Sequence, residues 1–114
     1  LLDFNASDDN YTSPKDCVKF LELIENNEIA GASQILAYMK EQERRGKIPA
    51  GLPEGTMCAN KTGELEDAEH DAAIVSTDKG DYAICVMSSG LNDTAAARGK
   101  IVEISGLAYQ SMIN

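Results

Sequence analysis

The sequence predicts a mixed α/β domain of the α+β class, in which an antiparallel sheet of about three strands is flanked by three helices. Three observations lead to this prediction: two segments with helical periodicity, three strand-like segments after them, and a long amphipathic segment at the end. The 114 residues, 43% of them hydrophobic and 25% charged, suit one compact domain or one piece of a larger domain.

The first helix is expected to begin at Pro14, after a stretch of polar residues. Ser13 offers a hydroxyl cap, proline suits the first helical position, and Asp16 puts a negative charge in the first turn. An apolar stripe at helical spacing follows and ends at Asn26-Asn27. Its members are Cys17, Leu21 and Ile24.

A second helix is expected over about residues 32–45, with Gly46 at the stop position. Its apolar face comprises Ile35, Leu36 and Met39. The basic residues near its end are interrupted by two glutamates, and we interpret them as a solvated helix end. These cations are Lys40, Arg44, Arg45 and Lys47. Residues 47–55 hold two prolines and two glycines and are expected to form a loop.

Three strands are expected over residues 56–61, 71–77 and 82–88. The Asp78-Lys79-Gly80-Asp81 linker predicts a hairpin between the last two. Because these two strands are continuously apolar, both faces of the sheet should be covered by helices.

The last helix is expected over about residues 94–112, capped by Asn92 or Asp93. Its predicted apolar stripe lies beside Val102. The members of this stripe are Ile101, Ile104, Ala108 and Met112.

The overall charge excludes some classes of function. A formal charge of −9 disfavours a nucleic-acid partner, which would need clustered cations. The sequence contains no apolar run long enough to span a bilayer and no signal-peptide pattern, although a signal could precede it in a longer precursor.

The three cysteines, Cys17, Cys58 and Cys85, show no metal-ligand spacing, and we expect neither a metal nor another cofactor. They are interpreted as buried free thiols. Cys58 and Cys85 are expected to lie buried and unpaired on neighbouring strands.

Lys61-Thr62-Gly63 is the motif that points to chemistry. It is expected to close the first strand and open a loop, so that an ammonium, a hydroxyl and a bare backbone project together from a strand edge. Such a group suits an anionic ligand, since lysine and threonine can hold a carboxylate and glycine permits close approach. As a tripeptide alone it is a weak signal.

The order of segments around this motif resembles the class A β-lactamases and related penicillin-recognising serine hydrolases. The resemblance covers most of the chain and implies that residues 1–114 form the C-terminal portion of a single β-lactamase-like catalytic domain. The segments that carry it are Asn10-Tyr11-Thr12-Ser13-Pro14, Ile48-Pro49-Ala50-Gly51-Leu52-Pro53, Cys58-Ala59-Asn60-Lys61-Thr62-Gly63, His70-Asp71-Ala72-Ala73-Ile74-Val75 and the terminal helix.

The resemblance also implies roles for four residues. Lys61 would be the catalytic-site lysine, which helps to hold the substrate carboxylate and tunes the site electrostatically, and Thr62 would donate a hydrogen bond to the same carboxylate. Gly63 completes the substrate-binding motif. Glu64 would contribute its backbone N–H to the oxyanion hole.

The departures from the family pattern are informative. The Ser-x-x-Lys nucleophile motif and the Ser-Asp-Asn motif are absent, and neither Ser33 nor Ser88-Ser89-Gly90 has a lysine three residues on. Residues 3–9 do not show the Glu-x-x-Leu-Asn pattern of the omega loop. We therefore expect the nucleophile-bearing half to lie upstream and this chain alone to be inactive.

Two other polar groups could suggest a general base and a metal site, but we favour a structural interpretation for both. His70 beside Asp71 is interpreted as a histidine ordered by a local carboxylate or capping a turn, since no nucleophile accompanies it. The acidic residues that follow the motif are interpreted as a solvated loop and not as a metal site. They are Glu64, Glu66, Asp67 and Glu69.

The resemblance implies hydrolysis of the β-lactam amide through a serine acyl-enzyme in the parent protein. The alternatives are a D-alanyl-D-alanine peptidase or penicillin-binding protein, or a non-catalytic binding module that kept the fold. The implied partners are a β-lactam or D-alanyl peptide and the missing N-terminal half, and we expect self-association without that half. The resemblance further implies a secreted or extracytoplasmic location in bacteria.

Overall fold

The computed structural model describes residues 11–114. Residues 3–9, where the omega-loop pattern was sought, lie outside the described part. The order of elements is α1 (Pro14–Glu25), α2 (Ala32–Lys40), a short 3-10 helix η1 (Pro49–Gly51), β1 (Cys58–Leu65), β2 (Ala68–Thr77), β3 (Gly80–Ser88) and α3 (Thr94–Ile113). The predicted α+β class, with three helices and a three-stranded antiparallel sheet, is confirmed.

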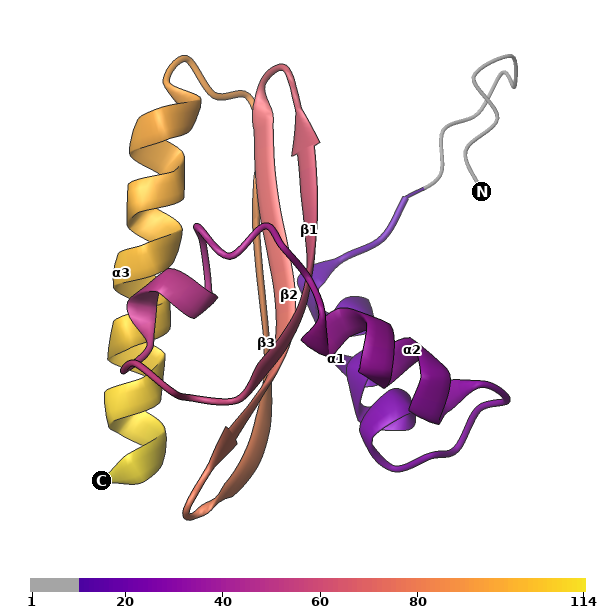
Figure 1. Cartoon of the computed structure of the whole chain (residues 1–114). Helices are drawn as coiled ribbons and strands as arrows, with labels where there is room; N and C mark the ends of the chain where they lie inside the picture. Colours follow the sequence, from indigo (N-terminus) through magenta and orange to yellow (C-terminus); the bar gives the residue numbers. More distant parts are fainter. Residues whose placement is uncertain (1–10) are drawn as a thin grey trace.

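The sheet lies between two helical layers. Its strand order is β1-β2-β3, and both pairs are antiparallel. Figure 1 shows α3 on one face of the sheet and the α1–α2 pair on the other. This arrangement confirms that helices cover both faces, as the apolar runs of β2 and β3 require.

Each helical layer has its own core. The α1–α2 side is built from Leu21, Ile24, Met39, Ala59 and Ile74. The α3 side is built from Ile48, Cys58, Ala73, Val75 and Ile101. Since neighbouring residues of a strand point to opposite faces, the pairs Cys58/Ala59 and Ile74/Val75 each contribute one side chain to each core.

The helix starts follow the predicted capping chemistry. The Ser13 hydroxyl accepts a hydrogen bond from the Asp16 amide at 3.1 Å, and α1 begins at Pro14. At the start of α3, the Asp93 carboxylate accepts from the Ala96 amide at 3.0 Å. Of the two residues considered for this cap, Asp93 is the one that fills it.

The prediction for the second helix was wrong in its length. Helix α2 ends at Lys40, and Gly46 is not its stop. The chain beyond it leaves the helix to run beside β1, where the Arg44 carbonyl accepts from the Asn60 side chain at 3.2 Å and Arg45 donates to the Cys58 carbonyl at 3.3 Å. These tertiary contacts outweigh the helix propensity of the segment.

The strand boundaries also differ from the prediction. Strand β1 extends to Leu65 and β2 begins at Ala68, so a two-residue turn, Glu66-Asp67, joins them. Lys61-Thr62-Gly63 therefore lies inside β1 and does not open a loop. The hairpin between β2 and β3 is confirmed, with Thr77 paired to Gly80 across the turn.

The apolar stripe of α3 was predicted only in part. Ile101 is buried, but Ile104 and Met112 are 44% and 49% exposed. The face that meets the sheet continues instead through Ser105, whose hydroxyl donates to the Ile48 carbonyl at 2.7 Å. An apolar pattern cannot predict a buried serine, because this residue is accommodated by its hydrogen bond and not by an apolar side chain.

Helix α3 also packs closely against η1. A Cβ on Gly51 would lie 2.3 Å from the Val102 carbonyl oxygen, so only glycine permits this approach. The residue thus ties the loop ahead of β1 to the terminal helix.

The prediction for the cysteines needs correction. All three are free, and Cys58 is buried, but Cys85 is only half-buried. Cys58 lies on β1 and Cys85 on β3, with β2 between them, so their strands are not neighbours.

Within residues 11–114, no helix combines the length and the apolar character that a membrane crossing needs.

Candidate functional site

The motif Lys61-Thr62-Gly63 lies on β1, an edge strand of the described sheet. Its three residues pair with Ala72, Asp71 and His70 of β2. Because side chains alternate along a strand, Lys61 and Thr62 project to opposite faces of the sheet.

Lys61 belongs to the α1–α2 face. Its side chain is exposed, and its ammonium donates to the Thr62 carbonyl at 2.5 Å. It lies at a recess of about 450 Å³, which we call the α1–α2 recess. The walls of this recess are largely apolar and include Cys17, Phe20, Tyr38, Met39, Cys85 and Met87. An apolar cavity with a single ammonium at its rim suits an apolar ligand that carries one anionic group.

Thr62 and Glu64 belong to the other face, toward α3. The Thr62 side chain is buried, and after Lys47 it is one of the groups that lower the pKa of Glu64. Glu64 stands directly opposite Glu69 of β2, so two carboxylates face each other across the hairpin. Like charges in this position destabilise a sheet unless a cation separates them.

Lys47 supplies that cation. Its ammonium lies 2.8 Å from an oxygen of Glu64 and 2.8 Å from an oxygen of Glu69, and it donates to the His70 carbonyl at 3.0 Å. The Lys47 side chain is only 5% exposed. Arg98 of α3 adds a second contact to Glu69 at 2.7 Å.

This arrangement lowers the pKa of both carboxyl groups, Glu64 and Glu69. Hydrogen bonding to Lys47 holds the pKa of Glu64 below its usual range, against the opposing effect of burial. For Glu69, burial alone would raise the pKa, but the hydrogen bonds and charges of Lys47 and Arg98 outweigh it and lower the pKa. Both side chains are therefore ionised at neutral pH.

The interpretation of this region from sequence was wrong in two respects. Lys47 is not part of a solvated helix end but is buried, and Glu64 and Glu69 are not in a solvated loop but in paired strands. The local sequence carried one usable signal, the presence of two glutamates at symmetric distances from a two-residue turn. Nothing in the sequence near Lys47 indicated that it would meet them.

Asp71 stabilises the same region through hydrogen bonds to two other segments of the chain. One of its carboxylate oxygens accepts from the Ile48 amide at 2.9 Å, and its other oxygen accepts from the Asn60 side chain at 3.2 Å. Burial raises the pKa of Asp71, and these hydrogen bonds partly offset the rise. The residue ties the loop before η1 to β1 and β2.

His70 plays a different part from the one expected. Its Nδ1 accepts a hydrogen bond from the Ser88 amide of β3 at 3.3 Å, and the ring lies against Gly63. It is ordered by a backbone amide and not by a carboxylate or a turn. The ring forms part of the wall of the α1–α2 recess.

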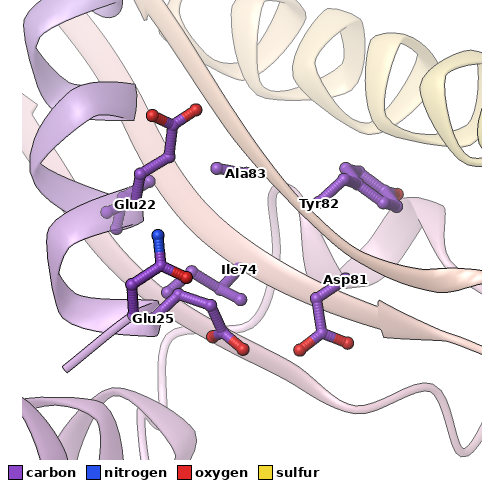
Figure 2. Close-up of a pocket in the computed structure, with 8 residues that line it drawn as sticks. Glu22, Glu25, Ile74, Asp81, Tyr82 and Ala83 are labelled. Carbon is purple, nitrogen blue, oxygen red and sulfur yellow. The ribbon is translucent and has the colours of Figure 1, made fainter.

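A second cavity, of about 390 Å³, lies between α1 and the β2–β3 hairpin and is lined by acidic groups. Figure 2 shows the carboxyl groups of Glu25 and Asp81 facing each other there. Hydrogen bonding to Asp81, burial and the charge of Asp81 raise the pKa of Glu25, while Lys40 lowers it. Such a cavity repels anions, which leaves the α1–α2 recess as the better site for a carboxylate ligand.

No cluster of three or more His, Cys, Asp or Glu side chains among residues 11–114 is arranged to hold a metal ion.

Comparison with a family model described as the β-lactamase enzyme family gives a match over residues 1–112. No curated protein matches the chain. The TLA-3 extended-spectrum β-lactamase aligns with a TM-score of 0.87 and 25% identity, covering 98% of this chain and 46% of that one.

Two further solved structures also align with most of this chain over less than half of their own length. PBP-A gives a TM-score of 0.76 and 27% identity, covering 88% of this chain and 39% of PBP-A. A mutant of PBP-A has been solved as an acyl-enzyme complex with penicillin G. The β-lactamase from Sphaerobacter thermophilus DSM 20745 gives a TM-score of 0.86 at 23% identity, covering 93% and 42% of the two chains. The chain thus spans less than half the length of these structures.

Proposed function

Because this chain belongs to the β-lactamase enzyme family, we propose that it is the C-terminal part of the catalytic domain of a β-lactamase-like serine hydrolase. In this proposal residues 1–114 supply the site for the substrate carboxylate. The observation that carries it is the position of Lys61-Thr62-Gly63 on an edge strand, with the Lys61 ammonium at the rim of an apolar recess.

Lys61 anchors the carboxylate of the substrate in this proposal. The Lys47 ammonium is neutralised by two carboxylates, whereas within residues 11–114 the Lys61 ammonium donates only to a backbone carbonyl. Lys61 is therefore the cation of the site that an incoming anion can engage without displacing an internal partner.

Thr62 and Gly63 complete the motif, and the Glu64 N–H stabilises the charge that develops on the acyl oxygen. The Glu64 carboxylate is turned toward Lys47, so its negative charge is compensated before a substrate arrives. Lys47 thereby acts as a positioning residue for the stretch of β1 that carries the oxyanion donor.

The nucleophile comes from a segment outside residues 1–114. A serine hydroxyl of that segment attacks the lactam carbonyl, the amide C–N bond breaks, and the nitrogen takes up a proton. The resulting acyl-serine ester is then hydrolysed by water. Lys61 holds the substrate carboxylate through both steps, whereas the buried Thr62 side chain lies on the opposite face of β1.

An experiment with the full-length parent protein tests this function. Incubation with a chromogenic cephalosporin and, separately, with a fluorescent penicillin distinguishes turnover from stable acylation. Hydrolysis of the cephalosporin is the expected result, and the absence of both signals would overturn the proposal.

A second candidate is a penicillin-binding D-alanyl peptidase. The similarity to PBP-A, of which a mutant forms an acyl-enzyme with penicillin G, favours it, as does the lack of the Glu-x-x-Leu-Asn pattern in residues 3–9. Without a base for deacylation, the acyl-enzyme is hydrolysed more slowly than it forms, and it therefore accumulates. A persistent fluorescent adduct without cephalosporin turnover would select this candidate.

A further inference from the structure

Two cysteines from distant parts of the chain meet at the α1–α2 recess. Cys17 lies in the first half of α1 and Cys85 in the middle of β3. Both are half-buried and both line the recess. The two thiols interact electrostatically, since Cys17 contributes to the raised pKa of Cys85, and the Cys17 sulfur also lies 3.7 Å from the Thr12 hydroxyl.

The packing of α1 on the sheet places Cys17 on the same side of the sheet as Cys85. Helix α1 packs directly on β3 and β2, with Leu21 and Ile24 in the core on that side of the sheet. Cys17 lies one turn before Leu21 on the same helical face, so it is held above the sheet by the same packing. The pair is therefore part of the fold and does not depend on a loop.

Cys58 provides a contrast within the same chain. It is 2% exposed and belongs to the core on the α3 side of the sheet. The sheet thus separates it from the other two thiols, and burial raises its pKa to about 11.

We propose that Cys17 and Cys85 form an intramolecular disulfide when the chain meets a small-molecule disulfide. The bond would join α1 covalently to β3 at the α1–α2 recess, which would fix the spacing of helix and sheet at the recess that Lys61 also lines. This site is independent of the proposed hydrolase function, because it needs neither the nucleophile nor a substrate.

The exchange proceeds in two balanced steps. The Cys17 thiolate attacks one sulfur of the small disulfide and releases one equivalent of its thiol. Cys85 then loses its proton and attacks the Cys17 sulfur, which releases the second equivalent. The two protein thiols are oxidised by two electrons in total, and the reagent is reduced to two thiols.

The second step is expected to be slow at neutral pH. Burial and the neighbouring Cys17 thiol raise the pKa of Cys85 to about 12, so little of it is deprotonated. The reaction should accelerate with rising pH, and the reagent should be uncharged, because the chain carries a formal charge of −9. Hydroxyethyl disulfide meets this requirement.

The test treats the 114-residue chain with hydroxyethyl disulfide at mildly alkaline pH and low protein concentration. Non-reducing peptide mapping should find Cys17 joined to Cys85 within one polypeptide chain, whose mass has fallen by two hydrogen atoms. The same link should form in Cys58→Ala, while Cys85→Ser should stop at a stable mixed disulfide on Cys17.

Phenylarsine oxide gives a second measurement, because a trivalent arsenical bridges two thiols that lie close together. One equivalent should bind the wild-type chain and protect Cys17 and Cys85, but not Cys58, from later alkylation. Persistent separate mixed disulfides on both cysteines, a link to Cys58, or a disulfide between two chains would overturn the proposal.

Discussion

Lys47 is the residue on which the end of the β1–β2 hairpin depends. It separates Glu64 from Glu69, which would otherwise face each other as like charges across the two strands. It also donates to the carbonyls of Gly63 and His70, one on each strand. A single buried ammonium thus holds together four groups at the position where the Lys61-Thr62-Gly63 motif ends.

Replacing Lys47 with methionine should destabilise the fold. The substitution keeps much of the side-chain volume but leaves Glu69 buried with only Arg98 as a cationic partner. Breaking a buried pair by removing one partner costs about 3 kcal/mol or more in the free energy of unfolding. Urea unfolding measures the loss, and Lys79→Met, in the exposed β2–β3 turn, is the matched control. Equal stability of the two variants would show that the Lys47 cluster contributes nothing.

The same cluster predicts a pH dependence. The folded-state pKa of Glu69 is lowered, so its contribution to stability is present above the unfolded pKa of roughly 4.3 and is lost as the pH falls through the folded value. The stability difference between the wild type and Glu69→Gln should therefore be large at pH 7 and shrink below about pH 4. Glu103→Gln, at an exposed position on α3, should show no such change. A Glu69→Gln difference that stays constant with pH would contradict this account.

At the scale of elements, short-range sequence patterns were sufficient to predict a boundary wherever a helix cap or a hairpin turn defined it. The starts of α1 and α3 and the turn between β2 and β3 could all be predicted from short-range patterns. The end of α2 could not, because the chain after Lys40 is held by Asn60 and Cys58, which come much later in the sequence.

The extension of β1 and β2 past the motif was missed for a related reason. Acidic residues next to a turn are typical of a solvated loop, and only the contact with Lys47 makes the paired strand favourable there. That the motif lies on the first strand could be predicted, but the opposite orientations of Lys61 and Thr62 followed only from its place inside β1. The encounter of Cys17 with Cys85 depended on the docking of α1 and had no sequence signal.

The cap of α3 offers a test at this scale. Asp93→Ala removes the acceptor for the Ala96 amide and should lower the free energy of unfolding by about 1 kcal/mol. Asn92→Ala, one residue earlier and exposed, should change it by less than about 0.5 kcal/mol. Thermal or urea unfolding distinguishes the two, and a larger effect at Asn92 would mean that the cap is assigned to the wrong residue.

At the scale of the whole molecule, the sheet is covered on both faces but much apolar surface remains open. Helix α3 exposes Ile104, Leu107 and Met112 at 44%, 68% and 49%. The apolar strand β3 is an edge of the described sheet, and the α1–α2 recess is open on the other side. In the proposal these surfaces meet the rest of the catalytic domain.

The isolated chain should consequently self-associate. Open apolar surface and an unprotected strand edge both favour contact between copies, since each square ångström of apolar area removed from water contributes about 25 cal/mol. Light scattering across micromolar concentrations should detect oligomers, and Leu107→Lys should shift them toward the monomer. A well-folded, strictly monomeric wild-type chain would show that the three-stranded unit is self-sufficient.

The acylation rate of the full-length parent tests the proposed role of Lys61 most directly. The rate constant with a penicillin should fall about 10- to 100-fold in Lys61→Ala, as expected for the loss of a charge-assisted hydrogen bond of about 1.5–3 kcal/mol. The methyl ester of the same penicillin, which lacks the carboxylate, should be affected much less, and Lys79→Ala should behave as the wild type with both compounds. Equal acylation of the wild type and Lys61→Ala by the free penicillin would contradict the assignment of this chain as the source of the carboxylate site.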